Sequence, residues 1–432
     1  MKFTSLLALY LYKFLTSLIA PLAVLFICYK KRHDKGYGLA VFNFLGFYKG
    51  KKKNSIWFHA ASVGEVNSIK PLVSRFAKKN PDFNIVISTM TSTGKETANS
   101  LKSYKNITVV TAPLDAPYSV CGFFKAFNPK ILIIVDTELW PNMLDKASKK
   151  KIPVVIINGR LQDKNVDSYK KHANLVKDLI ASKLSLVLAM SHSDKMRFEN
   201  IGVSQDKVIA AGNLKYDLIP NQVLFENAKT IKTRLLGNNV IGAISFHSGE
   251  EKHIINAFIE AKKTVNNLKL VLVGRHAQDC NKAIEYLKEL NIAYKRKSKI
   301  TSTDELKGLD KDVIIGDTLG EIEFYFGLCD VIFMGGSFVS IGGHNPLEPA
   351  YFSLPIITGP IYHNFSEQFE KLIDNGGAFL AEDEVHLAAF FEKLTKDKEL
   401  ASIAGVKALD IQQQGRGTLN FTLETIGKLL KK

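Results

Sequence analysis

The stretch Ser55-Ile56-Trp57-Phe58-His59-Ala60-Ala61-Ser62-Val63-Gly64-Glu65-Val66 passes from an apolar run through small residues into a helix-like segment. The apolar run is typical of a buried strand. The small residues favour a tight turn that leaves backbone N–H groups at the start of a helix, where anions bind well. Glu65 falls in the first helical turn. A carboxylate there either complements the helix dipole or takes a proton from a substrate hydroxyl, and the spacing alone supports both interpretations equally.

The alternation of apolar runs with amphipathic segments continues beyond this stretch. Further buried strands are expected at residues 85–88, 107–110, 131–135, 154–157, 184–189 and 208–210, with a helix at 68–79. The pattern then restarts with a helix at 221–236, strands at 240–245, 269–273, 313–315, 331–334 and 355–358, and a last helix at 418–430. Apolar strands that alternate with helices predict an α/β fold with parallel sheets covered on both faces. The two series predict two Rossmann-like lobes facing a cleft, with a ligand at the carboxyl ends of the strands.

The N-terminus predicts membrane attachment. Residues 6–28 are almost wholly apolar and are followed by Lys30-Lys31-Arg32-His33, with a lysine cluster at 49–53. A run of about 20 apolar residues can span a bilayer. Because Lys13 and Pro21 interrupt the run, an interfacial helix remains an alternative, as does a buried core helix. The basic flank predicts that the body stays on the cytoplasmic side.

We therefore expect a membrane anchor at residues 1–32, an N-terminal Rossmann-like domain at 33–212 and a C-terminal Rossmann-like domain at 213–432. The last helix is expected to cross back to the first lobe.

The composition narrows the class of partner. The 432 residues carry a formal net charge of +16, which favours anionic partners. No paired Cys/His spacing and no aromatic string typical of RNA-binding modules occurs, so an anionic membrane and an anionic substrate are expected rather than nucleic acid. The four cysteines lie far apart, which argues against a disulfide framework and against a zinc site.

Polar residues follow several expected strands in the first half. Thr93-Gly94 lies in a hydroxyl-rich turn that either binds a sugar carboxylate or caps a helix. Glu138 follows the strand ending at Val135 and is either a second acid of the site or part of a helix entry before Pro141. Arg160 is suited to a carboxylate or a phosphate.

The second half offers phosphate-binding patterns. His247-Ser248-Gly249 precedes a helix and suits either a phosphate or a helix cap. Arg275 offers a fixed cation for a leaving phosphate. The glycine-rich loops Gly335-Gly336-Ser337 and 342–349 are predicted to leave free N–H donors for phosphate, with Glu348 accepting hydrogen bonds from ribose hydroxyls. Histidines 59, 247, 276 and 344 do not have metal-ligand spacing and are expected to be satisfied or orienting residues.

Taken together, these stretches resemble the bacterial 3-deoxy-D-manno-octulosonic acid (Kdo) transferases of lipopolysaccharide synthesis. The resemblance covers nearly the whole chain in order: the apolar N-terminus, Ala61-Ser62-Val63-Gly64-Glu65, Thr137-Glu138-Leu139-Trp140-Pro141-Asn142, Asn158-Gly159-Arg160-Leu161, His247-Ser248-Gly249-Glu250-Glu251, Gly316-Asp317-Thr318 and 335–349. The chain departs from the family pattern at Asp136, Lys164, Asn165, Phe246 and Gly274.

The resemblance implies a two-domain GT-B glycosyltransferase of the cell inner membrane. It implies CMP-Kdo as donor, a lipid A precursor (lipid IVA) as acceptor, inversion at the anomeric carbon, and no cofactor or metal. Glu65 would be the catalytic base, with Glu138 also in the active site. The residues implied to bind CMP are Gly274, Arg275, Leu319, Gly320, Glu321, Asn345, Pro346, Leu347 and Glu348. Further contacts to sugar or acceptor are expected from Ser62, Gly64, Thr93, Gly94, Arg160, His247, Gly249, Gly336 and Ser337.

Two other functions fit the same pattern. One is a GT-B enzyme that uses a UDP-sugar, such as a hexosamine transferase or an epimerase. The other is a membrane-tethered binding protein that keeps the fold without turnover, because fold alone does not fix function. No motif encodes how many Kdo residues would be added.

Overall fold

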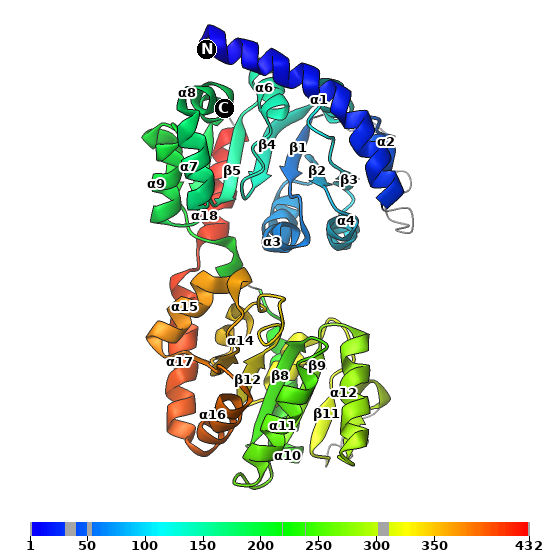
Figure 1. Cartoon of the computed structure of the whole chain (residues 1–432), viewed down its shortest axis with the longest axis vertical. Helices are drawn as coiled ribbons and strands as arrows, with labels where there is room; N and C mark the ends of the chain where they lie inside the picture. Colours follow the sequence, from blue (N-terminus) through cyan, green and yellow to red (C-terminus); the bar gives the residue numbers. More distant parts are fainter. Residues whose placement is uncertain are drawn as a thin grey trace. The chain divides into compact units, whose positions relative to one another are not determined.

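The computed structural model describes residues 2–30, 40–49, 54–217, 219–237, 239–300 and 311–430. The chain forms two compact units, shown in Figure 1: Met1–Asp217 together with Arg416–Lys432, and Leu218–Gly415. The sequence analysis placed the division between residues 212 and 213, whereas here it falls between Asp217 and Leu218. The expected basic residues 31–33 and 51–53 lie outside the described residues.

The first unit is built on a seven-stranded parallel sheet of order β3-β2-β1-β4-β5-β6-β7. Its strands are β1 (Ser55–His59), β2 (Asn84–Thr89), β3 (Ile107–Thr111), β4 (Pro129–Val135), β5 (Val154–Gly159), β6 (Leu186–Ala189) and β7 (Val208–Ala210). Its helices are α1 (Phe3–Lys30), α2 (Ala40–Phe44), α3 (Val63–Lys79), α4 (Ser92–Asn99), α5 (Pro117–Phe127), α6 (Pro141–Lys149), α7 (Asp163–Lys171), α8 (Ala173–Leu179), α9 (His192–Asn200) and α18 (Thr418–Leu430).

Helices cover both faces of this sheet, which explains why its strands are apolar throughout. Successive side chains of a strand point to opposite faces. Trp57 stacks on Phe123 of α5 with ring centroids 3.9 Å apart, and Phe58 packs edge-on against Phe76 of α3. The last helix, α18, belongs to this unit, where Leu419 is buried in the core that contains Phe58.

The second unit repeats the architecture with a seven-stranded parallel sheet of order β10-β11-β9-β8-β12-β13-β14. Its strands are β8 (Val240–Phe246), β9 (Lys269–Gly274), β10 (Tyr294–Arg296), β11 (Val313–Ile315), β12 (Val331–Met334), β13 (Ile356–Thr358) and β14 (Ala378–Leu380). Its helices are α10 (Gln222–Leu235), α11 (Glu251–Lys262), α12 (Ala277–Glu289), α13 (Ile322–Leu328), α14 (Leu347–Tyr351), α15 (Ser366–Asn375), α16 (Glu384–Lys396) and α17 (Lys398–Gln414). The predicted strands are confirmed; β10 and β14, at the two edges of this sheet, were not predicted.

Helix α1 packs lengthwise on the first unit, against α5 and α8 (Figure 1). Ser5, Leu9, Ala20 and Val24 are its buried residues. Their helical spacing defines one inward face, and polar bonds join the same face to the body. Lys13 Nζ lies 2.6 Å from Asp145 Oδ2.

Two more contacts fasten α1 to the region before α6. The Tyr12 hydroxyl donates to Asp115 Oδ2 at 3.0 Å, and Asn142 Nδ2 donates to Thr16 Oγ1 at 3.1 Å. Asp115 also accepts hydrogen bonds from the backbone N–H groups of Asn142 and Met143, both at 2.9 Å. The helix is therefore docked on the body by specific polar bonds as well as by apolar contact.

Each sheet has a point at which the strand order reverses. In the first unit β1 pairs with both β2 and β4, and in the second β8 pairs with both β9 and β12. Ligands of open α/β sheets bind at the carboxyl ends of the strands beside such a point. The segments at these positions are 60–65 and 136–140 in the first unit, and 247–250 and 335–349 in the second, and ligand-binding residues are expected there.

Candidate active site

In the first unit, Glu65 is held at the start of α3 by the turn that precedes it. Ser62 is the N-cap residue, and its Oγ accepts from Glu65 N at 3.3 Å. The Glu65 carboxylate turns back onto the same turn: Oε2 accepts from Ala61 N at 2.7 Å and Oε1 accepts from Ser62 Oγ at 2.7 Å. This reciprocal pattern resembles a capping box and fixes the carboxylate in one position.

The surroundings of Glu65 weaken it as an acid. Burial raises the pKa of Glu65 to about 7, against the hydrogen bonds from Ser62 and Ala61, which favour the carboxylate. The neighbouring carboxylates of Glu138 and Asp136 raise this pKa further. A carboxyl group that titrates near neutral pH can accept a proton from a substrate and release it again. The geometry thus supports both interpretations of Glu65: it caps the helix and it has the pKa of a general base.

Gly64 has a different role from the expected one. It lies inside α3, and an added Cβ would meet only Ser62 Oγ, at 3.9 Å. The backbone therefore does not require glycine here, and the expectation that Gly64 shapes a tight turn is wrong. Its effect is to leave open space over the turn that holds Glu65, where a ligand backbone or sugar can approach closely.

The turn that contains Thr93 and Gly94 packs directly against the Glu65 turn. A Cβ on Gly94 would lie 3.4 Å from the backbone carbon of Ser62, and Met90 N donates to Ala61 O at 3.1 Å. Thr91 caps α4, because its Oγ1 accepts from Gly94 N at 3.0 Å. This segment was expected either to bind a sugar carboxylate or to cap a helix. The structure shows the helix cap, in which Gly94 N is the donor, and Thr93 is exposed beside it.

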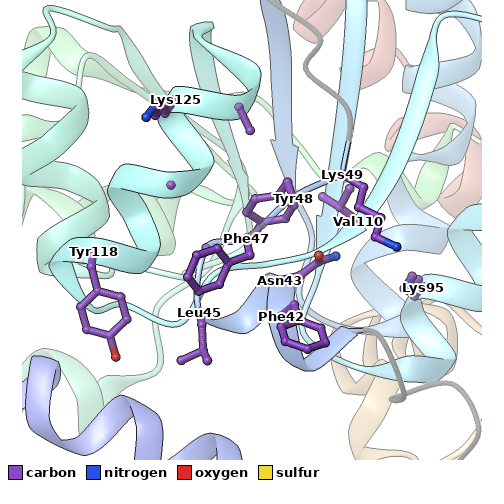
Figure 2. A pocket seen from close by; sticks show the side chains of 13 residues that line it. Phe42, Asn43, Leu45, Phe47, Tyr48, Lys49, Lys95, Val110, Tyr118 and Lys125 are labelled. Atoms are coloured by element: carbon purple, nitrogen blue, oxygen red, sulfur yellow. The ribbon is translucent and has the colours of Figure 1, made fainter.

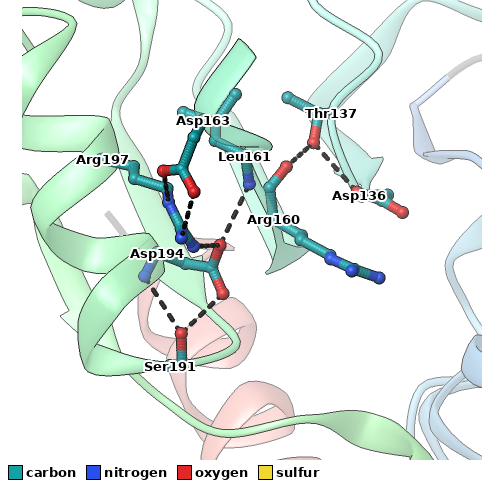
Figure 3. A network of polar contacts seen from close by, with 8 residues as sticks. All are labelled: Asp136, Thr137, Arg160, Leu161, Asp163, Ser191, Asp194 and Arg197. Atoms are coloured by element: carbon teal, nitrogen blue, oxygen red, sulfur yellow. Dashed lines mark hydrogen bonds and ion pairs between the residues drawn. The ribbon is translucent and has the colours of Figure 1, made fainter. Parts of the chain in front are cut away.

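The loop after β4 brings a second group of polar residues to the same edge (Figure 3). Asp136 adopts a left-handed backbone conformation, with φ of 63°, directly after the strand. Thr137 donates to Asp136 Oδ1 at 2.9 Å and to the backbone oxygen of Arg160. Glu138 accepts a hydrogen bond of 2.6 Å from the indole nitrogen of Trp140. Burial raises the pKa of Asp136, which Thr137, Arg160 and Lys215 oppose.

Arg160 is positioned by a network that the sequence analysis missed (Figure 3). Asp194 accepts from Leu161 N at 3.1 Å and from Ser191 Oγ at 2.6 Å, which fixes the backbone next to Arg160. Arg197 bridges Asp194 and Asp163. The Arg160 side chain extends away from this network toward the side of Asp136, and its charge opposes the rise in the pKa of that carboxyl group. A guanidinium in this position is suited to bind an anion.

His59 is buried under this edge. Its Nδ1 lies 2.9 Å from Ser88 Oγ, which also accepts from Trp57 Nε1 at 2.8 Å. Burial lowers the pKa of His59 to about 4, so the ring is neutral at pH 7. Its Nε2 has no hydrogen-bond partner in the described part of the chain. One ring nitrogen of His59 is therefore held by a hydrogen bond, and the other has no partner among the described residues.

In the second unit the glycine-rich loop is held by a buried carboxylate. Glu250 is fully buried and accepts hydrogen bonds from the N–H groups of His247 (2.8 Å), Gly336 (2.6 Å), Ser337 (3.0 Å) and Phe338 (2.9 Å). The N–H groups of Gly342 and Gly343 donate to the oxygen of Gly336. The expectation that Gly336, Ser337 and the following glycines leave free donors for phosphate is therefore wrong.

The same correction applies to the loop before α11. Gly249 N donates to Glu251 Oε2 at 2.6 Å, and Ser248 N donates to Asp279 Oδ1 at 2.9 Å. The glycines are needed for packing and backbone conformation instead. A Cβ on Gly335 would lie 2.4 Å from Phe246 Cα, and Gly342 has φ of +101°. The sequence pattern predicted that these N–H groups bind an external anion. Carboxylates of the protein itself accept their hydrogen bonds instead.

Side chains rather than backbone N–H groups form the cationic part of this edge. Arg275 follows β9 with an exposed side chain that pairs with no other described residue. Burial lowers the pKa of His344 to about 4 and the charge of Arg275 contributes to this, while the same charge opposes the rise that burial gives the pKa of Glu348. The rings of His247 and His344 stack at 5.1 Å with their Nε2 atoms 2.9 Å apart, and His276 lies edge-on to His247. Arg275 and three imidazoles therefore gather at one point.

Of the other residues implied to bind CMP, Glu348 lies near Arg275, whose charge acts on it. Asn345 Nδ2 donates to Glu348 Oε1 at 3.3 Å, while burial raises the pKa of Glu348. Pro346 and Leu347 form the start of α14. Leu319 is 92% exposed, Gly320 has φ of +79°, and Glu321 accepts from Thr318 Oγ1 at 2.9 Å. No group of three or more His, Cys, Asp or Glu residues suited to a metal ion occurs within the described ranges.

Solved structures with similar architecture define the class of fold. A glycosyltransferase from Rickettsia africae superposes with a TM-score of 0.54 at 15% identity, covering 89% of this chain and all of that one. Anabaena Alr3699/HepE, solved with UDP, gives 0.53 at 15% identity, covering 88% and 100%. The chain therefore has the GT-B fold.

The sequence relatives define the family. The family of 3-deoxy-D-manno-octulosonic-acid transferases (kdotransferase) matches residues 40–218. The 3-deoxy-D-manno-octulosonic acid transferase of Haemophilus influenzae is 32% identical over 94% of this chain and 92% of its own length. That of Aquifex aeolicus is 29% identical over 88% and 94%. The chain belongs to the Kdo transferase family of glycosyltransferases, which act in lipopolysaccharide synthesis.

Proposed function

We propose that this chain transfers Kdo with inversion from CMP-Kdo to lipid IVA at the cytoplasmic face of the inner membrane, with Glu65 as the catalytic base. The observation that carries the proposal is the environment of Glu65: a carboxylate fixed by two hydrogen bonds of 2.7 Å, with burial raising its pKa to about 7. Family membership supplies the transferred sugar.

The proposed reaction is a single displacement. A hydroxyl oxygen of the acceptor attacks the anomeric carbon while the bond from that carbon to the phosphate oxygen of CMP breaks. The hydroxyl proton passes to Glu65, and the bonding electrons leave with CMP. Arg275, whose exposed guanidinium has no partner within the described residues, neutralises the departing phosphate. These side chains can carry the reaction without a metal ion, so activity is expected to survive a chelator.

We further propose that α1 lies in the membrane interface instead of crossing the bilayer. It is the one described helix long and apolar enough to span a membrane, and its inward face contacts the body from Ser5 to Val24. That contact extends over about 30 Å, close to the thickness of the hydrocarbon core. A spanning helix would carry the polar partners Asp115 and Asp145 into the hydrocarbon, which is costly.

The opposite face of α1 favours the interfacial position. It exposes large apolar side chains along its whole length: Phe3, Leu7, Tyr10, Leu11, Phe14, Leu18, Leu22, Leu25, Phe26 and Tyr29. A helix with one docked face and one exposed apolar face suits burial at the boundary between headgroups and acyl chains.

The test of the reaction is Glu65→Gln in the full chain, assayed with CMP-Kdo and lipid IVA. Loss of the base is expected to lower kcat by about 10²–10⁴-fold. CMP binding should be unchanged, since Glu65 belongs to the first unit and the residues implied to bind CMP to the second. Glu424→Gln, at an exposed position of α18, is the matched control for the loss of one negative charge. A Glu65→Gln protein that folds, binds CMP and turns over normally would exclude Glu65 as the base. Transfer from a UDP-sugar in place of CMP-Kdo would show that CMP-Kdo is not the donor.

A further inference from the structure

The first unit contains an open groove that Glu65 does not line (Figure 2). It has a volume of about 770 Å³ and lies between α2 and its following segment, β3, α4 and α5. Ligand pockets usually measure about 300–1,000 Å³. The groove is therefore large enough for a substantial part of a ligand.

The groove has an apolar interior. Phe42, Leu45, Phe47 and Tyr118 line it, and Phe42 and Phe47 are 56% and 67% exposed. Large apolar side chains exposed together mark a binding surface. Figure 2 shows Phe42, Leu45 and Phe47 gathered on the segment around α2, with Tyr118 facing them from α5.

The rim of the groove is cationic. Lys49, Lys95 and Lys125 contribute to the lining, which contains no acidic residue. None of the three ammonium groups pairs with another described residue. Burial lowers the pKa of Lys95, so an anion that restores its lost solvation would bind favourably. An apolar groove with unpaired cations on its rim is complementary to a molecule that carries both acyl chains and phosphate.

The two ends of the groove connect the lipid surface with the candidate active site. Its walls α2 and α5 both contact α1, whose outer face is apolar. At the other end, Lys95 directly follows Gly94, which packs on the backbone of Ser62. A ligand in the groove would thus have its tail toward α1 and its head toward the turn that holds Glu65.

We propose that this groove binds an acyl chain of the lipid acceptor, with Lys49, Lys95 and Lys125 on its rim contacting the acceptor's phosphates. This inference rests on the proposed function, since it identifies how the acceptor of that reaction is held. We assign the groove to the phosphorylated glycolipid acceptor rather than to bulk phospholipid, because Lys95 on its rim directly follows Gly94, which packs on the backbone of Ser62.

The first experiment separates tail recognition from chemistry. The variants Phe42→Ser/Phe47→Ser and Lys95→Ala/Lys125→Ala are assayed in detergent micelles with lipid IVA and with its fully deacylated, phosphorylated disaccharide. The aromatic variant should raise KM for lipid IVA by about tenfold or more and leave KM for the deacylated acceptor unchanged. The lysine variant should raise KM for both acceptors, because both carry phosphate. Met196→Ser and Lys171→Ala, at exposed positions of α9 and α7, are the matched controls.

The second experiment does not depend on turnover. A lipid IVA analogue with a photoreactive acyl chain should label peptides containing residues 42–49 or 118–126, and excess lipid IVA should suppress the labelling. Labelling elsewhere, or suppression by phosphatidylglycerol as effective as by lipid IVA, would overturn the proposal. So would an aromatic variant whose KM for lipid IVA matches that of Met196→Ser. If the wild type fails to transfer Kdo but is labelled in the groove, the proposed reaction fails and the binding site stands.

Discussion

At the scale of single residues, Glu65 has a structural role and is also the proposed base. The carboxylate closes the turn before α3 by accepting hydrogen bonds from Ala61 and Ser62. The same bonds fix the position of the group while burial raises its pKa to about 7. The sequence predicted the residue and its place in the first helical turn, but pattern alone left the two roles as alternatives. The structure shows that they are compatible.

The first prediction concerns the pH dependence of transfer. A base must be deprotonated, so kcat should rise as the pH passes through about 7. Ser62→Ala removes a hydrogen bond that favours the carboxylate and should move this rise to higher pH. Glu138→Gln removes a repelling charge and should move it to lower pH. Rates measured from pH 5.5 to 9 test this, and shifts in the same direction for both variants would contradict it.

The raised pKa also affects stability. Because the folded-state pKa of Glu65 lies above the unfolded value, its contribution is complete below the unfolded pKa and is lost as pH rises through about 7. Glu65→Gln should therefore flatten the fall in stability between pH 5 and 8. Urea unfolding at several pH values measures the effect.

A further prediction concerns Gly64, where the backbone tolerates alanine. Alanine inside a helix is more stable than glycine by about 1 kcal/mol, so Gly64→Ala should raise Tm. The added methyl group would occupy the space over the catalytic turn and should lower kcat/KM for the acceptor. A variant that gains stability and keeps full activity would show that the acceptor does not pass over Gly64.

At the scale of elements, periodicity predicted the strands that lie inside the two sheets because they are apolar on both faces. It missed β10 and β14, the two edge strands of the second sheet. Each has only three residues, and β10 reads Tyr294-Lys295-Arg296, with no fully buried side chain. An edge strand is paired on one side only, so little selects an apolar pattern there. The three-residue edge strand β7 was predicted because it reads Val208-Ile209-Ala210, so the polar residues of β10 are what concealed that strand.

The glycine-rich loops show the limit of motif reading. Glycine density predicted that residues 335–343 leave free N–H donors for phosphate, whereas the described N–H groups of Gly336, Ser337 and Phe338 bond to Glu250. Glu250 reaches these N–H groups from 86 residues earlier in the chain. A single sequence does not reveal such a distant partner. The positions of Arg160 and Arg275 were predictable, in contrast, because they depend only on where strands end.

The prediction at this scale is that Glu250 stabilises the second unit. Glu250→Gln replaces one carboxylate oxygen by a donor, which leaves two buried N–H groups without acceptors. The expected loss in free energy of unfolding is about 2–5 kcal/mol. Glu251→Gln, next in the chain and bonded to the single N–H of Gly249, is the control and should lose less. Equal losses in urea unfolding would contradict the role given to Glu250.

At the scale of the whole molecule, the net charge of +16 predicted an anionic partner in general terms. In the first unit, lysines border an apolar groove next to a helix with an exposed apolar face, and we propose that an anionic partner binds there. The sequence predicted an anchor but left its orientation open. The choice between an interfacial and a spanning helix depends on tertiary contacts such as the ion pair between Lys13 and Asp145.

The prediction at this scale distinguishes an interfacial helix from a spanning one. An epitope tag placed before Met1 should be accessible from the same side of sealed membrane vesicles as a tag after Lys432. Access from opposite sides would show that α1 crosses the bilayer. Leu18→Ser/Leu22→Ser, on the exposed face, should reduce membrane association without lowering Tm. Leu9→Ser, on the buried face, should lower Tm.

The bonds of Asp115 connect α1 to the loop of the candidate active site. This carboxylate joins Tyr12 to the first N–H groups of α6, immediately after the loop that carries Glu138 and Trp140. Burial raises the pKa of Asp115 to about 6, against the bonds from Asn142, Met143 and Tyr12, so each lost donor makes its ionisation costlier. Removing the first thirty residues to obtain a soluble enzyme would withdraw one of these donors. Rates measured on such a shortened protein would then describe a loosened Glu138 loop as well as the loss of lipid contact.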